Sequence, residues 1–239
     1  MRILLIRPGA IGDCIRHFPD LEALAGEYTE VWIPRAVIPL VFFADRVRAL
    51  ADTGIDLAGL PGMPLPGAFT EFDRIHSWYG TQREDFREAV SHLPFTFYPA
   101  IPSTPPTTAP RIPIAGPRHG QVILHPFSGS AKKNWPLGDF KNLAAKFESP
   151  AWTCGPEEVL DGAVRFDNLA DLARWISGAR LFIGNDSGIT HLAAAVGTPT
   201  LAIFGPTDPA IWCPAGNHVR WTRFANPEEV FGIATEMLR

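Results

Sequence analysis

The feature that most constrains the fold of this 239-residue chain is the segment 181–209, which reads LFIGNDSGITHLAAAVGTPTLAIFGPTDP. Its apolar runs at 181–183 and 200–204 are typical of buried strands, and the small-residue stretch 189–196 between them is typical of a helix. A strand, a helix and a strand in this order predict a parallel unit of an α/β protein. Parallel sheets bind ligands beyond the carboxyl ends of their strands, where this segment has its polar loops.

The loop after the first of these strands has two readings. Asp186 or Ser187 is placed to cap the helix that follows, and Gly188 permits close approach of a ligand to the backbone. Free N–H groups at a helix start favour an anionic group such as a phosphate. The same Asn-Asp-Ser-Gly run could equally be only a cap and a turn. From these residues alone, a ligand-binding role and a purely structural role are both possible.

The same alternation of strands and helices runs through most of the chain. It predicts parallel, doubly wound sheets. Strands are predicted at 2–7, 30–33, 74–78, 121–125, 151–154, 180–183, 200–204 and 218–222. Helices are predicted at 13–25, 38–43, 82–92, 137–147, 169–177, 187–196 and 227–238, the last with Asn226 as its cap.

Eight prolines between positions 94 and 117 interrupt this alternation. Proline at such density excludes a helix or the interior of a sheet and is typical of a semi-rigid linker. We therefore predict an N-terminal domain at 1–98, a Pro-rich linker at 99–118 and a C-terminal domain at 119–239.

Composition excludes several classes of protein. A hydrophobic content of 46% and a charged content of 19% indicate a globular protein with a sizeable core. The net charge of −4 provides no basic face for nucleic acid. No apolar run is long enough to span a bilayer, and the first residues resemble a buried strand rather than a signal peptide. Cys14, Cys154 and Cys213 lack metal-ligand spacing, so we expect reduced thiols in a cytoplasmic protein.

A second polar cluster follows the first predicted strand, at residues 7–13 (RPGAIGD). Its glycines allow a tight turn into a helix, with Gly12 and Asp13 near the helix start. From the residues alone, a capping role for Asp13 is favoured over a catalytic one. The spacing differs from a dinucleotide fingerprint, and no acidic residue ends the second strand, which disfavours an NAD-dependent oxidoreductase.

A third cluster follows the strand at 121–125 and reads HPFSGSAKKNWP. The hydroxyls of Ser128 and Ser130 can donate to a diphosphate, and Lys133 can supply positive charge. Alternatively, Lys133 is only an exposed surface lysine. For Trp135 we favour a packing role in the core over contact with a ligand. No HExxH or DxD-type metal motif is present.

Together these segments resemble the sequence of glycosyltransferase family 9, the ADP-heptose:lipopolysaccharide heptosyltransferase family. The resemblance includes a Gly-Asp pair near the start, a Lys-x-Trp-Pro motif and an Asp-Ser-Gly motif followed by His-Leu-Ala-Ala and Gly-Pro-Thr-Asp-Pro. Phe127 departs from the glycine usual in the family. The matching positions are Arg7, Gly12, Asp13, Pro19, Lys133, Trp135, Pro136, Asp186, Ser187, Gly188, His191, Leu192, Ala193, Ala194, Pro199, Gly205, Pro206, Thr207, Asp208 and Pro209.

The resemblance implies a GT-B-like α/β fold, with two doubly wound, Rossmann-like domains facing a cleft. It implies that the N-terminal domain is the acceptor side, reduced because the chain is shorter than usual members. It also reverses the preference at Asp13, since in this family that residue is the proposed general base, and an attacking acceptor hydroxyl must lose its proton.

For the remaining site residues, the resemblance implies contact with a donor sugar nucleotide. Lys133 and the helix start at Ser187 and Gly188 would hold the leaving diphosphate without a metal ion or other cofactor. Further donor or substrate contacts are expected from Gly12, Ser128, Ser130, Asp186, His191, Thr207 and Asp208.

The implied function is an inverting, metal-independent transfer of a heptose-like sugar. The donor would be a nucleotide-diphospho-sugar, ADP-linked, and the acceptor a glycan or glycolipid of the cell envelope, in lipopolysaccharide biosynthesis. Such an acceptor would imply peripheral contact with the inner membrane. The alternative is a non-catalytic nucleotide-sugar-binding protein with a degenerate acceptor domain.

Overall fold

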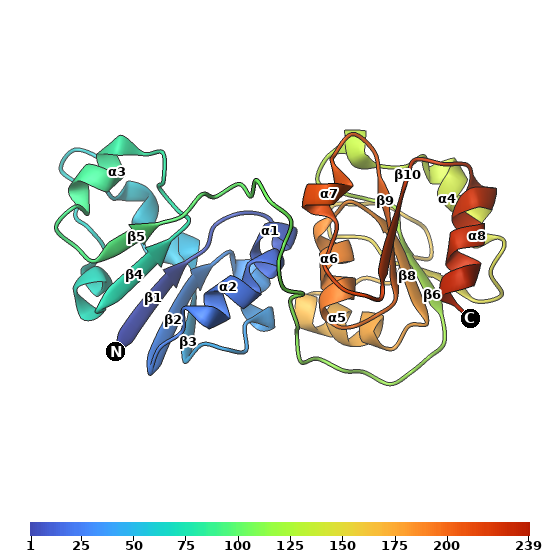
Figure 1. The fold of residues 1–239 in the computed structure, drawn as a ribbon, viewed down its shortest axis with the longest axis horizontal. Helices are drawn as coiled ribbons and strands as arrows, with labels where there is room; N and C mark the ends of the chain where they lie inside the picture. The colour runs from blue at the N-terminus through green and yellow to red at the C-terminus, as the bar shows by residue number, and fades with distance from the viewer. The chain divides into compact units, whose positions relative to one another are not determined.

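The computed structural model describes residues 1–239, which divide into two compact units, Met1–Ser103 and Thr104–Arg239. Each unit contains a five-stranded sheet in which all neighbouring strands are parallel (Figure 1). The α/β class predicted from the alternation of apolar runs is therefore confirmed.

The first unit has strand order β3-β2-β1-β4-β5. Its strands are β1 (Arg2–Ile6), β2 (Tyr28–Ile33), β3 (Arg46–Ala49), β4 (Arg74–Ser77) and β5 (Phe95–Phe97). Its α-helices are α1 (Ile11–Arg16), α2 (Phe18–Ala23) and α3 (Glu84–Ala89). Short 3₁₀ helices occupy η1 (Arg35–Leu40), η2 (Leu50–Asp52), η3 (Ile55–Leu57) and η4 (Gly67–Glu71).

Successive side chains of the central strands in the first unit point to opposite faces of the sheet, and both faces are buried. Leu4 and Ile6 of β1 belong to a cluster with Trp32, Phe69 and Phe86, in which the Trp32 and Phe69 rings stack with centroids 5.4 Å apart. The intervening β1 residues are buried as well, as a strand covered on both sides requires.

Three predictions for the first unit need correction. The helix predicted at 13–25 is interrupted at His17, because Pro19 has no N–H with which to continue the hydrogen-bond ladder. The helix predicted at 38–43 is a 3₁₀ helix, Arg35–Leu40, which contains Pro39. The helix predicted at 82–92 covers only Glu84–Ala89.

Two strands of the first unit were not predicted from the sequence. The short β3 alternates polar and apolar residues over only four positions, too few to predict a strand. The short β5 lies between Pro94 and Pro99 at the edge of the sheet, where a missing N–H is tolerated. The Pro94 carbonyl oxygen still accepts a hydrogen bond from the Ile75 N–H at 2.9 Å.

The second unit has strand order β10-β9-β8-β6-β7. Its strands are β6 (Val122–His125), β7 (Pro150–Trp152), β8 (Leu181–Asn185), β9 (Thr200–Phe204) and β10 (Val219–Arg223). Its helices are η5 (Ala131–Lys133), α4 (Leu137–Ala144), α5 (Leu169–Ser177), α6 (Gly188–Ala195), α7 (Pro209–Trp212) and α8 (Pro227–Met237). The strands and longer helices of this unit follow the sequence predictions closely, and the Asn226 side chain caps α8 as expected.

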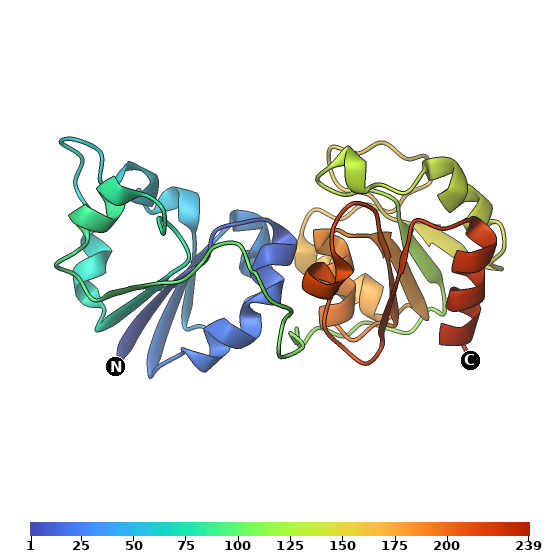
Figure 2. The ribbon, with the colours of Figure 1, turned by 45° about the horizontal axis from the view of Figure 1, so that its top comes forward.

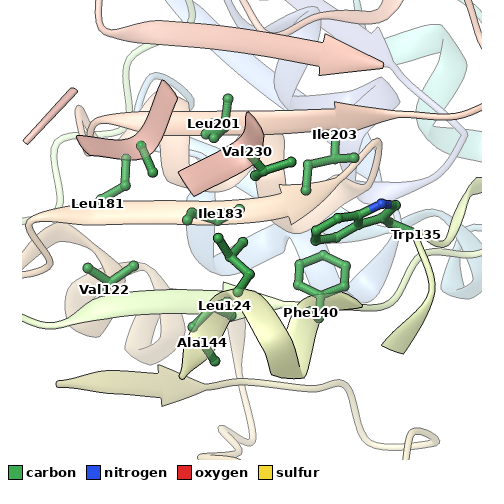
Figure 3. Packing of buried hydrophobic residues seen from close by; sticks show 12 residues of the cluster. Val122, Leu124, Trp135, Phe140, Ala144, Leu181, Ile183, Leu201, Ile203 and Val230 are labelled. Atoms are coloured by element: carbon green, nitrogen blue, oxygen red, sulfur yellow. The ribbon is translucent and has the colours of Figure 1, made fainter. Parts of the chain in front are cut away.

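Helices cover both faces of the second sheet, with α4 and α8 on one face and α5 and α6 on the other (Figures 1 and 2). Figure 3 shows the core beneath α4 and α8, where Leu124, Ile183 and Ile203 of three adjacent strands meet Phe140 and Trp135. The two aromatic rings pack edge to face with centroids 5.0 Å apart. Burial of Trp135 confirms the packing role predicted for it.

The Pro-rich stretch after Ser103 belongs to the second unit. Ile112 and Ile114 are buried, and the Ile112 N–H donates to the Ala195 carbonyl oxygen at 2.9 Å. Apolar residues between the prolines thus contribute to the core of this unit. Across the whole chain, no helix is both long and apolar enough to cross a membrane.

Both sheets have a position where the strand order changes direction. In the first unit it lies between β1 and β4, and in the second between β6 and β8. The loops that leave two such strands diverge to opposite faces, which opens a crevice at their carboxyl ends. These two places are where each unit is best suited to bind a ligand.

Candidate functional site

Three loops of the second unit meet through one buried carboxylate at the carboxyl ends of β6, β8 and β9. The Lys133 ammonium lies 2.8 Å from Asp186 Oδ2, and the Thr207 hydroxyl donates to the same oxygen at 2.7 Å. The side chain of Asp186 is 4% exposed, whereas that of Lys133 is 31% exposed. We call these three residues the Lys133 cluster. Lys133 is held by Asp186 and still faces solvent, so N–H donors remain for an anionic ligand.

Asn185, the last residue of β8, fixes the loop that carries Lys133. It is fully buried; its Oδ1 accepts from the Trp135 N–H at 3.0 Å, and its Nδ2 donates to the Pro126 carbonyl at 2.8 Å. One side chain therefore satisfies both ends of the 126–135 loop. Sequence analysis did not single out Asn185; a polar residue closing an apolar strand was the available signal.

Of the two hydroxyls predicted to contact a diphosphate, that of Ser128 has a partner within its own loop. Ser128 Oγ donates to the Ser130 carbonyl at 2.8 Å, which folds the loop upon itself. Ser130 precedes the 3₁₀ turn that presents Lys133. Gly129 is exposed, and a Cβ at this position would meet nothing within 4 Å. The fold thus does not require a glycine here.

The start of α6 matches the predicted cap. Ser187 is its N-cap, accepting from the Thr190 N–H at 3.3 Å, and Gly188 is the first helical residue. This outcome decides between Asp186 and Ser187, which the sequence left open. His191 is buried one turn into α6. The N–H groups of the first turn and the Lys133 cluster both lie just beyond β8.

Thr207 and Asp208 follow β9 and have separate roles. Thr207 joins the Lys133 cluster, whereas Asp208 is exposed and caps α7 by accepting from the Ala210 N–H at 3.0 Å. Arg223 of β10 stabilises this loop by donating to the carbonyls of Gly205 and Thr207 at 2.9 and 2.8 Å. Arg223 was not predicted, because a charged residue on an edge strand carries no distinctive pattern.

The remaining lysines lie outside the cluster. Lys146 forms a surface ion pair with Glu228 at 3.0 Å. Lys141, on α4, lies beside a cavity of about 260 Å³ formed with residues including Trp152 and Val159. Both lysines are exposed.

Two of the three cysteine thiols have pKa values well above their ordinary value. Burial raises the pKa of Cys14 to about 12, and burial together with Asp186 raises the pKa of Cys213 to about 11. All three cysteines are free, and no three His, Cys, Asp or Glu side chains gather as a metal ion would require.

In the first unit, Gly12 and Asp13 lie in the opening turn of α1, just beyond β1. Asp13 Oδ2 accepts from the Ala10 N–H at 3.0 Å, so the carboxylate closes the turn as a capping group. Gly9 has a φ of +116°, and a Cβ there would lie 3.0 Å from the Asp13 side chain, which explains the glycine. The N-cap of α1 is Ala10, so Asp13 is not the N-cap that the residues alone favoured; it supports the cap from the third helical position.

A cavity of about 660 Å³ opens at the carboxyl ends of β1, β4 and β5 in the first unit. Trp78 and Tyr98, which line it, stack with centroids 4.5 Å apart. Arg83 and Arg87 also line it; Arg83 pairs with Asp85, and Arg87 contacts the Thr81 carbonyl and the Phe97 ring. Aromatic faces and guanidinium groups suit a polar ligand with flat apolar faces, such as a sugar.

Comparison with known proteins places these features in a family context. Residues 166–230 match the sequence model of glycosyltransferase family 9 (heptosyltransferase). A lipopolysaccharide heptosyltransferase 3 of Escherichia coli is 45% identical over 64 residues, which cover 27% of this chain and 18% of that protein. A lipopolysaccharide heptosyltransferase 1 of Pseudomonas aeruginosa is 50% identical over 93 residues, covering 32% of this chain and 26% of that protein.

The fold resemblance is more extensive than the sequence resemblance. The solved structure of the Escherichia coli ADP-heptose lipopolysaccharide heptosyltransferase II aligns with a TM-score of 0.73 and 14% identity, covering 100% of this chain and 98% of that one. The aligned stretches of the curated relatives, by contrast, span less than a third of those proteins. The chain is thus similar in sequence to glycosyltransferase family 9 over residues 166–230, and similar in its α/β fold to a solved heptosyltransferase.

Proposed function

We propose that the protein is a glycosyltransferase that takes a heptose-like sugar from a nucleotide-diphospho-sugar. The observation that carries this proposal is the Lys133 cluster, which lies where the strand order of the second sheet changes direction. A cation and the N–H groups at the start of α6 lie at the strand ends where a diphosphate is bound most favourably. An ADP-linked donor is supported by the name of the similar solved enzyme, an ADP-heptose heptosyltransferase.

The donor half of the reaction follows from the charges of this cluster. As the bond between the sugar and the diphosphate breaks, negative charge accumulates on the leaving phosphate. Lys133 and the N–H groups near Ser187 and Gly188 would stabilise that charge without a metal ion. Asp186 orients Lys133 and is itself neutralised by it. His191 and Ser130 are proposed as further donor contacts, and Asp208, which caps α7, only as a support for the loop.

The acceptor half is assigned to the first unit. We propose that an acceptor glycan occupies the cavity beside Trp78 and Tyr98, with Gly12 and Asp13 at the adjoining strand end. Asp13 would remove the proton of the attacking hydroxyl. Attack on the face opposite the departing diphosphate inverts the anomeric carbon. A cell-envelope glycolipid as acceptor and peripheral contact with the inner membrane belong to this proposal.

The test combines binding and transfer. ADP, UDP and GDP are titrated calorimetrically, and ADP-heptose is then incubated with lipopolysaccharide that lacks heptose. We expect tightest binding of ADP, transfer that persists in EDTA, and a product of inverted anomeric configuration by NMR. Tight ADP binding with neither transfer nor hydrolysis of ADP-heptose would support the alternative, a non-catalytic sugar-nucleotide-binding protein.

Asp13 has a matched variant in Asp13→Asn. The amide retains an oxygen that accepts from the Ala10 N–H, so the start of α1 is preserved while the base is lost. We expect turnover to fall about 10²- to 10⁴-fold with donor affinity unchanged. Normal turnover in this variant would refute the role of Asp13.

A further inference from the structure

Arg7, the residue that follows β1, is a guanidinium buried in the first unit. It is 1% exposed, and burial lowers its pKa. Its Nε is the one buried side-chain polar atom of the chain without a hydrogen-bond partner. A buried cation with an unsatisfied N–H costs folding free energy, so its presence calls for a physical explanation.

The other guanidinium nitrogens contact two separate segments, residues 13–17 and Ala100. Nη2 donates to the Asp13 carbonyl at 3.1 Å and lies 3.3 Å from His17 Nδ1. Both Nη1 and Nη2 donate to the Ala100 carbonyl at 3.3 Å. None of these partners is a carboxylate, so the contacts hold the backbone in place rather than neutralise a charge.

Two of these contacts lead to the cavity of the first unit. Ala100 lines that cavity directly, and the His17 ring packs edge-on against Trp78, another lining residue, with centroids 6.0 Å apart. The third contact holds the main chain of Asp13 itself. Arg7 thus connects the turn that presents the Asp13 carboxylate with the wall of the cavity.

We infer that Arg7 is a positioning residue, which fixes Asp13 relative to the cavity wall. This inference rests on the proposed function, in which the cavity holds the acceptor and Asp13 deprotonates it. A planar guanidinium holds its N–H donors in a rigid fork and can donate to two carbonyls of different segments at once, whereas an apolar side chain cannot. A buried cation at position 7 is explained if the distance between Asp13 and the bound acceptor must be held within a fraction of an ångström.

The test compares Arg7→Met and Asp13→Asn, using ADP-heptose and heptose-free lipopolysaccharide as substrates. For Arg7→Met we expect kcat to fall about 100-fold, the value associated with a 1 Å misplacement, with the donor KM unchanged. The unfolding temperature should stay the same or rise, because an apolar side chain replaces a buried cation. In Arg7→Ala, added guanidine should restore part of kcat.

A second measurement does not depend on turnover. The Cys14 N–H donates to the Ala10 carbonyl at 3.0 Å in the first turn of α1. Its hydrogen exchange should accelerate at least tenfold in Arg7→Met, while amides of β2 keep their protection. Unchanged exchange at Cys14, or normal kcat in Arg7→Met while Asp13→Asn is inactive, would overturn the inference. Full activity of Asp13→Asn would instead refute the proposed function.

Discussion

Both units contain a five-stranded parallel sheet, although with different strand orders, and they use the ends of their strands in different ways. In the second unit the polar side chains beyond β6, β8 and β9 bond to one another, as in the pair Lys133 and Asp186. In the first unit the corresponding loops carry aromatic side chains, and they line a cavity beside Trp78 and Tyr98. A site for a diphosphate needs fixed charges, whereas a site for a glycan needs a surface of the right shape, and this difference motivates the proposed assignment of donor and acceptor to separate units.

The first prediction tests whether the two units differ only in the loops at their strand ends or also in their cores. Phe140 and Phe86 are both fully buried, each in the core of its own unit. If the two cores are equally well packed, Phe140→Ala and Phe86→Ala should each lower the free energy of unfolding by about 3–5 kcal/mol. Urea unfolding of both variants measures this. A cost well below that range for Phe86→Ala alone would show that the difference extends into the core of the first unit.

The second prediction assigns nucleotide binding to the second unit. Lys133→Ala removes one charge-assisted contact, worth about 1.5–3 kcal/mol, so ADP affinity should fall about ten- to a hundredfold. Calorimetric titration with ADP measures the loss. Lys141→Ala makes the same change of charge on α4 and should have little effect. Arg87→Ala, in the first unit, should have none; a comparable loss there would break the assignment.

The third prediction concerns the residue that holds the Lys133 loop. Asn185→Ala leaves the Trp135 N–H and the Pro126 carbonyl without their buried partner. We expect the free energy of unfolding to fall by about 2 kcal/mol, within the range for unsatisfied buried groups. ADP affinity should fall as well, because Lys133 loses its support. If unfolding is unaffected in urea, water has replaced the amide and Asn185 does not hold the loop.

The smallest expected effect is a dependence on pH. Burial lowers the pKa of His125 below its ordinary value of 6.5, and does the same for His17 and His76 in the first unit. Below pH 6.5 the unfolded chain binds protons that the folded chain does not, so stability is full above 6.5 and declines as the pH falls toward the lowered pKa values. Each histidine contributes a slope of at most about 1.4 kcal/mol per pH unit.

Urea unfolding at pH 7.0 and 5.5 measures this decline. His125→Gln should reduce the slope, because one buried imidazole is removed. With two such histidines in the first unit and one in the second, the first unit should be the more sensitive, as hydrogen exchange of β1 and β8 amides can show. A slope unchanged in His125→Gln would refute its contribution.

The regular parts of the fold could be predicted because their apolar patterns are local. The helix at Leu169–Ser177 and the strand at Thr200–Phe204 follow the predicted bounds. The structure departs from the predicted elements where proline, which lacks a backbone N–H, interrupts the apolar pattern. Pro19 divides the first helix after β1, and the short strand at Phe95–Phe97 lies among prolines that indicated a break in regular structure.

The candidate site could be predicted in part. The cap at Ser187 depends on neighbours in sequence, and the family motif drew attention to Lys133 and Asp186. That these two form an ion pair, with Thr207 as a third member, depends on which strands become adjacent in the sheet. No local pattern encodes that adjacency. For the same reason the cavity of the first unit, built from three separate loops, has no sequence signature.

The two hydrogen bonds of Asn185 span 50 and 59 residues of chain. Contacts of such sequence separation form late, because the loop between them must first be closed against its entropy. The Lys133 loop is therefore completed only when β6 and β8 have paired. A nucleotide that requires this loop binds the finished unit and not its folding intermediates, so it shifts the folding equilibrium by mass action. The cellular supply of the donor would then influence how much of this protein survives proteolysis as well as how fast it works.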